Sequence, residues 1–466
     1  MQALLNIPLA LRLMIVLAIS AGVASLLNAA IYAWSWERRW VSPWQRPPVG
    51  VGPRSWLDRL PVYGWLRLRR DEAIVGKRFW LRPMAIELGF AVAMAALYWW
   101  EVERLGLLTP QLAEWFRLAP AGPPTVAAAS IAGPLHWQFL SHAILASLMT
   151  IATFIDFDER IIPDEVTFPG TLVGLLLATL APLSLLPGVQ LRAAAPVAGV
   201  VLEEPGQGGP QPIAVPGGGG RLFLEPVHAA APNQRQVWQE GQPNRGSLLF
   251  GLGCFGLWCF ALTDRRWPGR GPALRNLDKK LNLVLARVRR DLSNSPLRET
   301  LVAGGLLICM VWFTGGPHWL GLLSALVGMI GGGLIVWAVR IIGTAVLRRE
   351  AMGFGDVTLM MMVGAFVGWQ ACPIIFFLAP AAGLVLAILN LVLRGDAAIP
   401  YGPFLCLATA GVVVGWGWVW GVGQQIYSVG WLVPVVLLAC FVLLGVLLGL
   451  LQGLKALLGV AGHDEE

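Results

Sequence analysis

Long apolar runs separated by polar or basic connections dominate this chain. Runs of about 17 or more apolar residues predict membrane-spanning helices. These runs lie near residues 84–100, 135–155, 166–187, 247–263, 300–316, 319–345, 372–393, 402–421 and 428–454, with a shorter one at 357–369. The stretch from Pro8 to Trp34 is too long for a signal-peptide core and predicts a retained first membrane helix. We therefore expect an all-α, polytopic membrane helix bundle of about 9–11 transmembrane helices with a small cytoplasmic loop domain.

The composition excludes a water-soluble globule. Of the 466 residues, 56% are hydrophobic and 13% are charged, whereas an ordinary soluble domain has roughly 25% charged residues. The six cysteines include no Cys-x-x-Cys pair. Their spacing argues against both a zinc cluster and a disulfide framework.

The net charge of +7 is unevenly distributed among the connections. Residues 35–83 carry eleven Lys and Arg and residues 264–299 carry ten, so the positive-inside rule places both segments in the cytoplasm. Residues 101–134 carry two and residues 188–246 carry four, which places these segments outside. Because 188–246 is rich in Gly, Pro and Gln, we expect an insertion without a stable core, with a short hairpin near Arg221–Pro226.

These features divide the chain into six parts. They are a first transmembrane helix (1–34), a basic cytoplasmic loop domain (35–83), transmembrane helices with a first acidic motif (84–187), an extracytoplasmic insertion (188–246), additional helices around the basic segment 264–299 (247–316), and a transmembrane core with a second acidic motif (317–466). Within the basic segment, residues 273–292 resemble an amphipathic helix that binds anionic lipid headgroups. Nucleic acid is a poor competitor, because the basic charge adjoins membrane spans and lacks a recognisable binding fold.

Acidic residues beside apolar runs are the most informative positions, because a carboxylate in hydrocarbon is costly unless it faces protein, water or a partner. The first acidic cluster follows the third predicted span and contains Asp156, Asp158, Glu159 and Asp164. Pro163 should end the preceding helix, and Asp164 is then placed to cap the next one. Asp156 should stay within the helical run, and Asp158 lies about 200° around the helix from it.

The second acidic cluster is Gly353-Phe354-Gly355-Asp356, directly before the apolar residues 357–368. Its two glycines allow close backbone approach or positive φ angles, and they leave Asp356 at the start of a membrane helix. Both clusters fall on the predicted cytoplasmic side. Two carboxylates sharing one proton are the machinery of aspartic proteolysis, since the ionised one deprotonates water and the protonated one polarises the scissile carbonyl.

Each acidic cluster also has a purely structural interpretation. Asp164 and Asp356 could be helix N-caps, and Asp158 and Glu159 could be solvated loop charges. Asp156 could pair with an arginine one turn later, at position 160. In the same predicted helix, His142 could belong to a proton relay or be a packing histidine. Two clusters on one side of the membrane favour chemistry over capping.

These acidic clusters resemble the motifs of the type IV prepilin peptidases. Asp156-Phe-Asp-Glu-Arg-Ile-Ile-Pro-Asp164 resembles the first aspartate motif of that family, and Gly353-Phe-Gly-Asp356 resembles its GxGD motif. Residues 58–70, Gly76-Lys-Arg and Glu87-Leu-Gly resemble its first cytoplasmic loop. Ile399-Pro-Tyr-Gly-Pro-Phe-Leu405 resembles its late Pro-x-Gly-Pro-Phe element. The four matches occur in the order of the family.

This resemblance implies an intramembrane aspartyl endopeptidase of the bacterial inner membrane, with its active site toward the cytoplasm. Its substrates would be type IV prepilins or type II secretion pseudopilins, from which it would remove a short basic leader by cutting after a glycine. The catalytic carboxylates would be Asp156 and Asp356, and no cofactor is expected for proteolysis. The supporting residues would be Asp158, Asp164, Gly353, Gly355, Pro163 and Glu87.

The chain departs from the family in its first cytoplasmic loop. Members typically carry two Cys-x-x-Cys pairs there that bind zinc, whereas residues 35–83 contain no cysteine, so zinc is not expected. The family also N-methylates the new N-terminus with S-adenosylmethionine, an activity associated with this loop. The loop lacks a GxGxG-like fingerprint, so methylation with S-adenosylmethionine stays open for this chain. The insertion 188–246 and the two spans that follow it also exceed the usual eight-helix plan.

Two other functions compete with proteolysis. A secondary transporter would use membrane acids to bind protons or cations, but it should show similar halves and acids near the bilayer midplane, whereas these acids cluster at one face. A catalytically inactive relative could serve as a scaffold of a secretion system. The missing cysteines allow that alternative, and the presence of both Asp156 and Asp356 argues against it.

Overall fold

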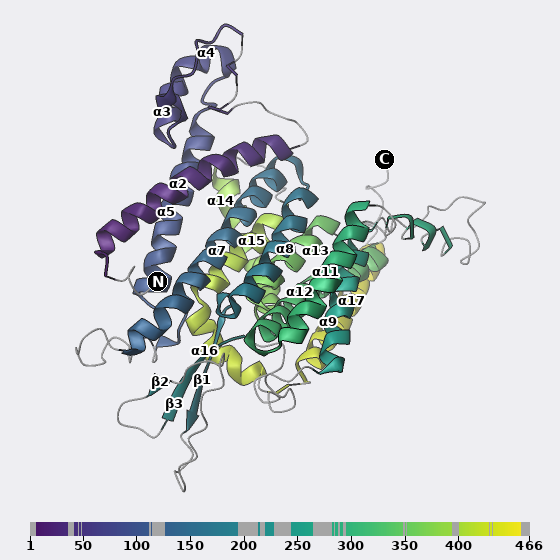
Figure 1. The fold of residues 1–466 in the computed structure, drawn as a ribbon. Coiled ribbons are helices and arrows are strands. Elements are labelled where there is room, and N and C mark those ends of the chain that lie inside the picture. The colour runs from purple at the N-terminus through teal and green to yellow at the C-terminus, as the bar shows by residue number, and fades with distance from the viewer. Residues whose placement is uncertain are drawn as a thin grey trace.

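The computed structural model shows a helix bundle with a small unit at one end and a small sheet at the other (Figure 1). It describes residues 6–35, 42–44, 46–47, 49–110, 113, 126–193, 213–214, 220–227, 244–263, 282–283, 285–287, 289–291, 295–347, 350, 352–393, 400–427, 429–430 and 432–457. Most of the basic segment 264–299 and of the insertion 188–246 therefore lies outside the described residues, as does the greater part of the predicted amphipathic helix at 273–292.

Every predicted apolar run contains helix. The helices are α2 (Leu9–Trp34), α5 (Leu81–Tyr98), α7 (Val126–Glu159), α8 (Asp164–Leu180), α9 (Arg245–Ala261), α11 (Ser295–Thr314), α12 (Gly316–Leu347), α13 (Phe354–Val367), α14 (Ala371–Leu393), α15 (Gly402–Val414), α16 (Trp416–Tyr427) and α17 (Leu432–Leu457). In the described part of the chain, six helices are long and apolar enough to cross a membrane, or seven if a bent pair counts as one span. The expected polytopic membrane helix bundle is thus confirmed.

The span predicted near 402–421 is broken by a sharp bend. The chain forms two helices there, α15 and α16, which meet at an angle of 89°. Gly415 follows the last residue of α15 and Trp416 begins α16. The run of apolar residues is continuous through this bend, so hydropathy alone does not reveal it.

Helix α13 lies at the centre of the bundle. Every residue from Asp356 to Val367 is buried, which explains why this helix is apolar on all sides. Its closest neighbour is α12, where a Cβ atom on Gly364 would stand 2.0 Å from the carbonyl oxygen of Gly328. Only glycines permit two backbones to approach this closely. The second acidic motif therefore leads into the most enclosed helix of the protein.

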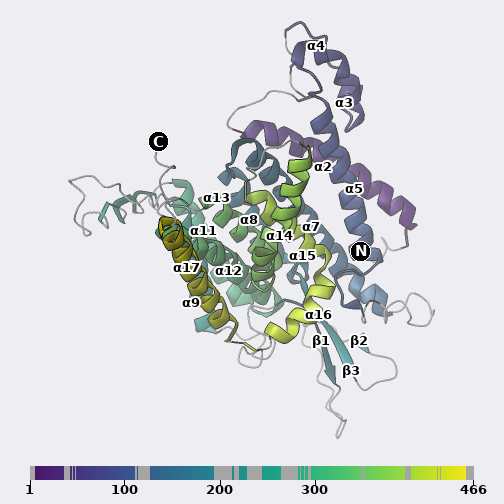
Figure 2. The same ribbon diagram turned by 180° about the vertical axis from the view of Figure 1, so that it is seen from behind.

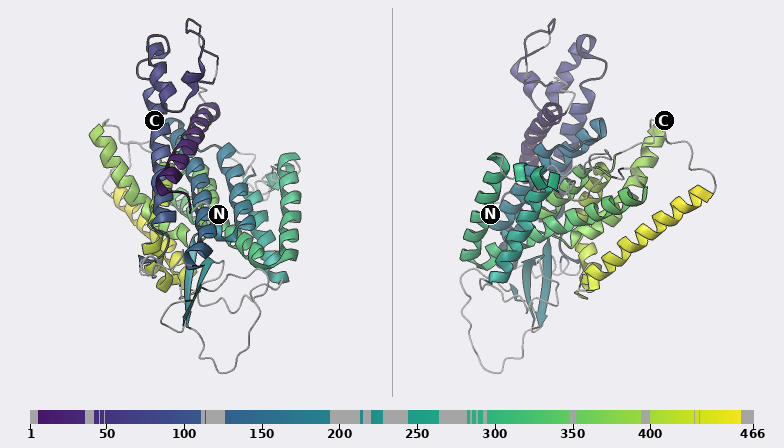
Figure 3. Two further views of the ribbon diagram at one scale, coloured as in Figure 1. Left: turned by 60° about the vertical axis from the view of Figure 1, so that its left-hand side comes forward. Right: turned by 90° about the vertical axis from the view of Figure 1, so that its right-hand side faces the viewer.

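Helix α17 lies at the edge of the bundle (Figures 2 and 3). In the apolar stretch of α17, 0% of the residues are buried inside the protein. In the apolar stretch of α11, 6% of the residues are buried. Apolar helix surfaces of this kind are suited to contact with lipid.

A small unit precedes α5 and stands beyond the bundle (Figure 1). This loop unit, residues 54–80, contains two 3₁₀ turns, Trp56–Arg59 (η1) and Arg69–Asp71 (η2), and two short helices, α3 (Tyr63–Leu68) and α4 (Glu72–Val75). Four or six residues are too few for an isolated helix to be stable in water. The loop unit therefore depends on side-chain contacts for its structure.

A three-stranded antiparallel sheet lies at the opposite end of the bundle (Figure 1). Its strands are β1 (Pro187–Ala193), β2 (Ile213–Ala214) and β3 (Gly220–Pro226), in the order β1-β3-β2. Where a short hairpin was expected near Arg221–Pro226, the chain forms a single strand, β3, which pairs with β2 and, over a longer stretch, with β1, where Leu191 is opposite Leu222. The Trp416 indole N–H donates to the Pro187 carbonyl at 2.9 Å and ties the sheet to α16.

Candidate active site

The first acidic motif forms the end of α7 and the turn into α8. Helix α7 ends at Glu159, and Arg160 takes a positive φ of 57°. Pro163 is extended, as predicted for a residue that separates two helices. Asp156 lies in the last turn of α7 and is only 5% exposed. The chain thus holds this carboxylate in the helix and turns sharply after it.

The second acidic motif forms the start of α13. Gly353 occupies the N-cap position, with φ −66° and ψ 154°, and Asp356 lies in the first helical turn with 7% exposure. The Asp356 carboxylate accepts a hydrogen bond from the backbone N–H of Gly353, which is half of a capping box. Part of the structural interpretation of Asp356 is therefore realised. Of the two alternatives for the glycines, a positive φ is found at neither Gly353 nor Gly355.

The two motifs meet through Ile162. A Cβ atom on Gly355 would stand 2.9 Å from the Cβ of Ile162, so the missing side chain allows α13 to approach the α7–α8 turn. The charges of Asp156 and Asp356 act on each other across this contact. Two carboxylates that lie 200 positions apart in the chain are thereby brought to one place.

A third segment, the start of α15, completes the site. The backbone N–H of Gly402 donates a hydrogen bond to the Asp156 carboxylate. A Cβ atom at Gly402 would lie 2.5 Å from Asp156 Oδ2 and 2.9 Å from Ile162 Cδ1, so a larger residue would displace the carboxylate. Tyr401 is close enough for the charge of Asp356 to act on it. The late Pro-x-Gly-Pro-Phe element therefore belongs to the site, a role that the sequence did not assign to individual residues.

Neither site carboxylate has a cationic partner in the part of the chain that the structure describes. Within the described residues, no lysine, arginine or histidine forms an ion pair with Asp156 or Asp356, and the alternative pairing of Asp156 with Arg160 is not formed. Arg160 contributes only its backbone N–H, which donates to the Asp156 carbonyl at 2.9 Å. Two adjacent unpaired carboxylates can share a proton and serve as base and acid in hydrolysis.

The remaining acids of the first motif have different surroundings. Asp158 is an ion-pair partner of Arg82, with Nη2 and Oδ2 2.8 Å apart. Asp164 is exposed, and the prediction that it caps α8 is wrong. The N-cap position belongs to Pro163, and no side chain forms a cap hydrogen bond. Asp164 is instead the first residue of the helix, where a negative charge still favours the helix dipole.

Glu87 lies at a junction of three segments and is fully buried. Its carboxylate accepts hydrogen bonds from Asn28 Nδ2 in α2 at 3.1 Å, from the backbone N–H of Val62 at 2.5 Å, and from the Trp65 indole N–H in α3 at 2.9 Å. These bonds fasten the loop unit to α2 and α5. Glu87 supports the architecture around the site.

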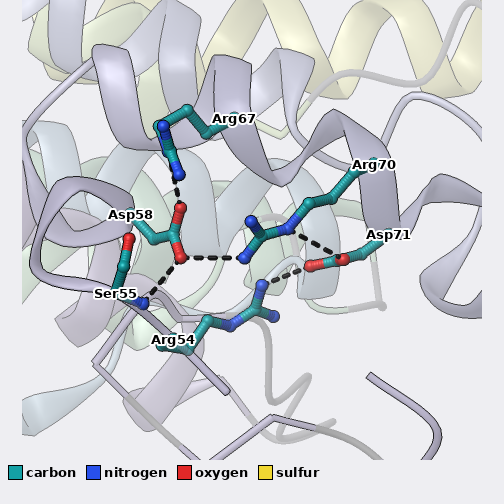
Figure 4. Close-up of polar contacts among 6 residues, drawn as sticks. All are labelled: Arg54, Ser55, Asp58, Arg67, Arg70 and Asp71. Carbon is teal, nitrogen blue, oxygen red and sulfur yellow. Dashed lines mark hydrogen bonds and ion pairs between the residues drawn. The ribbon is translucent and has the colours of Figure 1, made fainter. Parts of the chain in front are cut away.

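Within the loop unit, Asp58 is the centre of a charge network (Figure 4). Its carboxylate is 0% exposed and accepts hydrogen bonds from Arg67 Nε at 2.9 Å, Arg70 Nη2 at 2.8 Å and the Ser55 backbone N–H at 2.8 Å. Burial alone would raise the pKa of Asp58, but these bonds and the positive charge of Arg70 outweigh it and lower the pKa to about 2.

The same network continues to Asp71. Arg54 and Arg70 both form ion pairs with this carboxylate, and Arg70 thereby links the two aspartates (Figure 4). The network lies in the segment that has no cysteine. Among the described residues, no group of three His, Cys, Asp or Glu side chains is placed to hold a metal ion. The expectation about zinc remains a prediction.

His142 has a buried partner that the sequence did not indicate. Its Nδ1 lies 2.7 Å from Glu101 Oε1, and the two side chains are 1% and 0% exposed. Glu101 belongs to a π-helical turn, Trp99–Glu103 (η3), directly after α5. Neither alternative for His142 anticipated a buried carboxyl group beside it. An acid at the end of an apolar run was the available signal, but the link to His142 depends on tertiary packing.

Comparison with known proteins supports the interpretation of the two acidic motifs. The sequence matches the type IV leader peptidase family over residues 143–204 and 283–388. The first matched segment contains Asp156 and Asp164, and the second contains Gly353 and Asp356. This match confirms the expected resemblance to the type IV leader peptidase family over these two segments.

Individual relatives cover a smaller part of the chain. It is 32% identical over 155 residues to the type 4 prepilin-like proteins leader peptide-processing enzyme of Escherichia coli O78:H11, covering 33% of this chain and 55% of that protein. It is 34% identical over 151 residues to the prepilin leader peptidase/N-methyltransferase of Pseudomonas putida, covering 31% and 49%.

The prepilin leader peptidase/N-methyltransferase of Legionella pneumophila is 29% identical over 138 residues, covering 29% of this chain and 47% of that protein. The chain spans about half the length of the curated relatives it matches. No solved structure matches it.

Proposed function

We propose that this protein is a membrane-embedded aspartyl endopeptidase that removes basic leaders from type IV prepilins or type II secretion pseudopilins, cutting after a glycine. The observation that carries the proposal is the convergence of Asp156 and Asp356 beside the Gly402 N–H, without a cationic partner among the described residues. The names of its relatives supply the substrate class.

The chemistry follows from two carboxylates that share one proton. The ionised carboxylate removes a proton from water, and the resulting hydroxide attacks the scissile carbonyl carbon. The protonated carboxyl group donates its proton to the carbonyl oxygen. When the tetrahedral intermediate collapses, the C–N bond breaks and the amine takes up the proton that the first carboxylate removed. A hydroxyl group of the intermediate returns its proton to the second carboxylate as the C=O bond reforms, so one water is consumed and both carboxyl groups regain their starting state.

The proposed orientation places the site toward the cytoplasm of a bacterial inner membrane. The site lies at the end of the bundle that carries the loop unit, as the contact between Arg82 at the start of α5 and Asp158 shows. The loop unit belongs to the segment with eleven Lys and Arg, which the positive-inside rule assigns to the cytoplasm. Apolar helices such as α17 would contact lipid, and no nucleic-acid partner is proposed.

Leader removal by the purified protein tests the proposal. The protein is reconstituted in liposomes with a synthetic substrate that has a basic leader, a glycine and an apolar helix, and the products are identified by mass spectrometry. Wild-type protein should release the leader after the glycine, and Asp156→Asn and Asp356→Asn should not. Cleavage that persists in both variants, or none by the wild type, would refute the function.

The same experiment addresses the open alternatives. Addition of S-adenosylmethionine shows by the mass of the product whether its N-terminus is methylated, which the names of two relatives suggest for those proteins. A secretion-system scaffold would bind the substrate without cutting it. The transporter hypothesis has no supporting observation, because the two site carboxylates lie together at one end of the bundle.

A further inference from the structure

Arg82 connects the start of α5 to the last turn of α7. Its Nη1 atom donates to Asp158 Oδ1 at 3.0 Å, and its Nη2 atom lies 2.8 Å from Asp158 Oδ2. Nη2 also donates to the carbonyl oxygen of Phe154 at 3.4 Å, and the guanidinium lies 5.3 Å from the centre of the Phe154 ring. One side chain therefore holds the helix end by a carboxylate, a carbonyl and an aromatic ring.

These contacts lie on both sides of Asp156 in the chain. Phe154 precedes it by two positions and Asp158 follows it by two. Arg82 therefore contacts the final turn of α7 on both sides of Asp156. A cation at the C-terminal end of a helix also interacts favourably with the helix dipole. The bidentate arrangement with Asp158 uses the planar fork that only arginine provides.

Arg82 lies in the first turn of α5, and hydrogen bonds from α2 hold this turn in place. The Asn28 amide donates to the carbonyl of the adjacent residue, Pro83, at 2.9 Å, and also to Glu87 one turn later. Glu87 in turn receives the loop-unit bonds described above. Arg82 thus links a part of the protein that is held by several hydrogen bonds to the turn that carries a site carboxylate.

We propose that Arg82 is a positioning residue that fixes the carboxylate of Asp156 relative to Asp356 and Gly402. The inference rests on the proposed function, since it assigns the role of Arg82 in that reaction. Displacement of a reacting group by about 1 Å can cost roughly 100-fold in rate. The pair is only moderately enclosed, with side-chain exposures of 35% for Arg82 and 26% for Asp158, and such pairs contribute little to global stability. Its loss should therefore change the rate far more than the melting temperature.

The test compares Arg82→Gln, Arg82→Lys and Asp158→Asn in the reconstituted cleavage reaction. Arg82→Gln should lower kcat by roughly 10- to 100-fold with little change in KM. Arg82→Lys should recover part of the loss, because it restores the charge but not the bidentate geometry. The double variant with Asp158→Asn should be no slower than Arg82→Gln alone, since both remove one interaction. Arg69→Gln is the matched control, because Arg69 is an exposed arginine over the Trp80 ring in the loop unit.

Two results would overturn the positioning role. One is a wild-type kcat in Arg82→Gln, and the other is an increase in KM alone, which would mean that Arg82 contacts substrate. Hydrogen exchange supplies a readout that does not need activity, because Arg82→Gln should accelerate exchange in residues 154–160 selectively. If the wild type fails to cut, the proposed function fails, and unchanged exchange in this segment would still refute the positioning of α7.

Discussion

Asp58 in the loop unit and the pair Asp156 and Asp356 in the bundle are buried carboxylates with opposite surroundings. Asp58 accepts hydrogen bonds from two arginine side chains and one backbone N–H. Asp156 and Asp356 each receive a backbone N–H and, among the described residues, no cation. An arginine-bonded carboxylate is held ionised and cannot exchange protons near neutral pH. The difference separates a structural carboxylate from a pair available for acid and base chemistry.

The same difference distinguishes the two ways in which these regions are built. The loop unit has short helices and is held by charge, whereas the site is held by close contacts of Gly355 and Gly402 with Ile162. Substitution in the loop unit should therefore affect stability, and substitution at the glycine contacts should affect catalysis.

Outside the two aspartates themselves, the largest effect is expected from Gly402→Ala. The added methyl group would lie 2.5 Å from Asp156 Oδ2, so the carboxylate must move and its bond to the Gly402 N–H must lengthen. We expect leader removal to fall by at least about 100-fold. Rates of cleavage under single-turnover conditions measure this.

Gly411→Ala is the matched control for Gly402→Ala. Gly411 lies in the same helix, and its added methyl group would meet only Leu378 Cδ2 at 3.8 Å, an ordinary contact. It should cut at nearly the wild-type rate. Equal rates for the two variants would show that the start of α15 does not shape the site.

Asp58→Ala should produce an intermediate effect, on stability. It leaves Arg67 and Arg70 without their shared buried acceptor, and removal of one partner from a buried ion pair costs about 3–5 kcal/mol. Because both arginines are partly exposed, at 32% and 45%, the lower value is expected. Limited proteolysis of residues 54–80 and hydrogen exchange measure the local loss.

The comparison variant for Asp58→Ala is Glu72→Gln, at a half-buried residue of the same unit whose side-chain oxygen accepts the Arg78 backbone N–H at 2.8 Å, a bond that an amide oxygen can also accept. In this variant, residues 54–80 should be protected from proteolysis and hydrogen exchange almost as well as in the wild type. If Asp58→Ala does the same, the charge network does not hold the loop unit.

The smallest effect is expected from lowering the pH, which should weaken the structure of the loop unit. The pKa of Asp58 is lowered from 3.8 to about 2, so its contribution to stability is complete above about pH 4 and is lost as the pH falls toward 2. Protection of residues 54–80 from hydrogen exchange, compared with Asp58→Asn, should therefore be constant from neutral pH to about 4 and decline below it. A decline already complete at pH 5 would contradict the pairing.

The membrane bundle could be predicted because apolar runs report directly on helices that cross a bilayer. The run at 357–369 and the observed α13 (Phe354–Val367) differ by a few residues. Asp156 and Asp356 could be identified because acids beside apolar runs are rare and because their motifs resemble a known family. The bend at Gly415 could not be predicted from hydropathy, because apolar residues continue through it.

The charge network and the Glu101–His142 pair could not be predicted for a different reason. Both depend on which side chains meet in three dimensions. In the sequence, the arginines near Asp58 are visible only as an excess of positive charge in the loop. The prediction of Asp164 as an N-cap is wrong by one position, because a one-residue shift of the helix start cannot be resolved from the sequence.

Single-turnover cleavage by Asp156→Asn, Asp356→Asn and the double variant is the sharpest test of whether the two aspartates act as one unit. Thermal unfolding shows that each protein is folded. If they do, each single variant loses at least about 10⁴-fold in rate and the double variant is no slower than either. A single variant that keeps a substantial part of the wild-type rate, or losses that multiply in the double variant, would show that the two aspartates do not act as one unit.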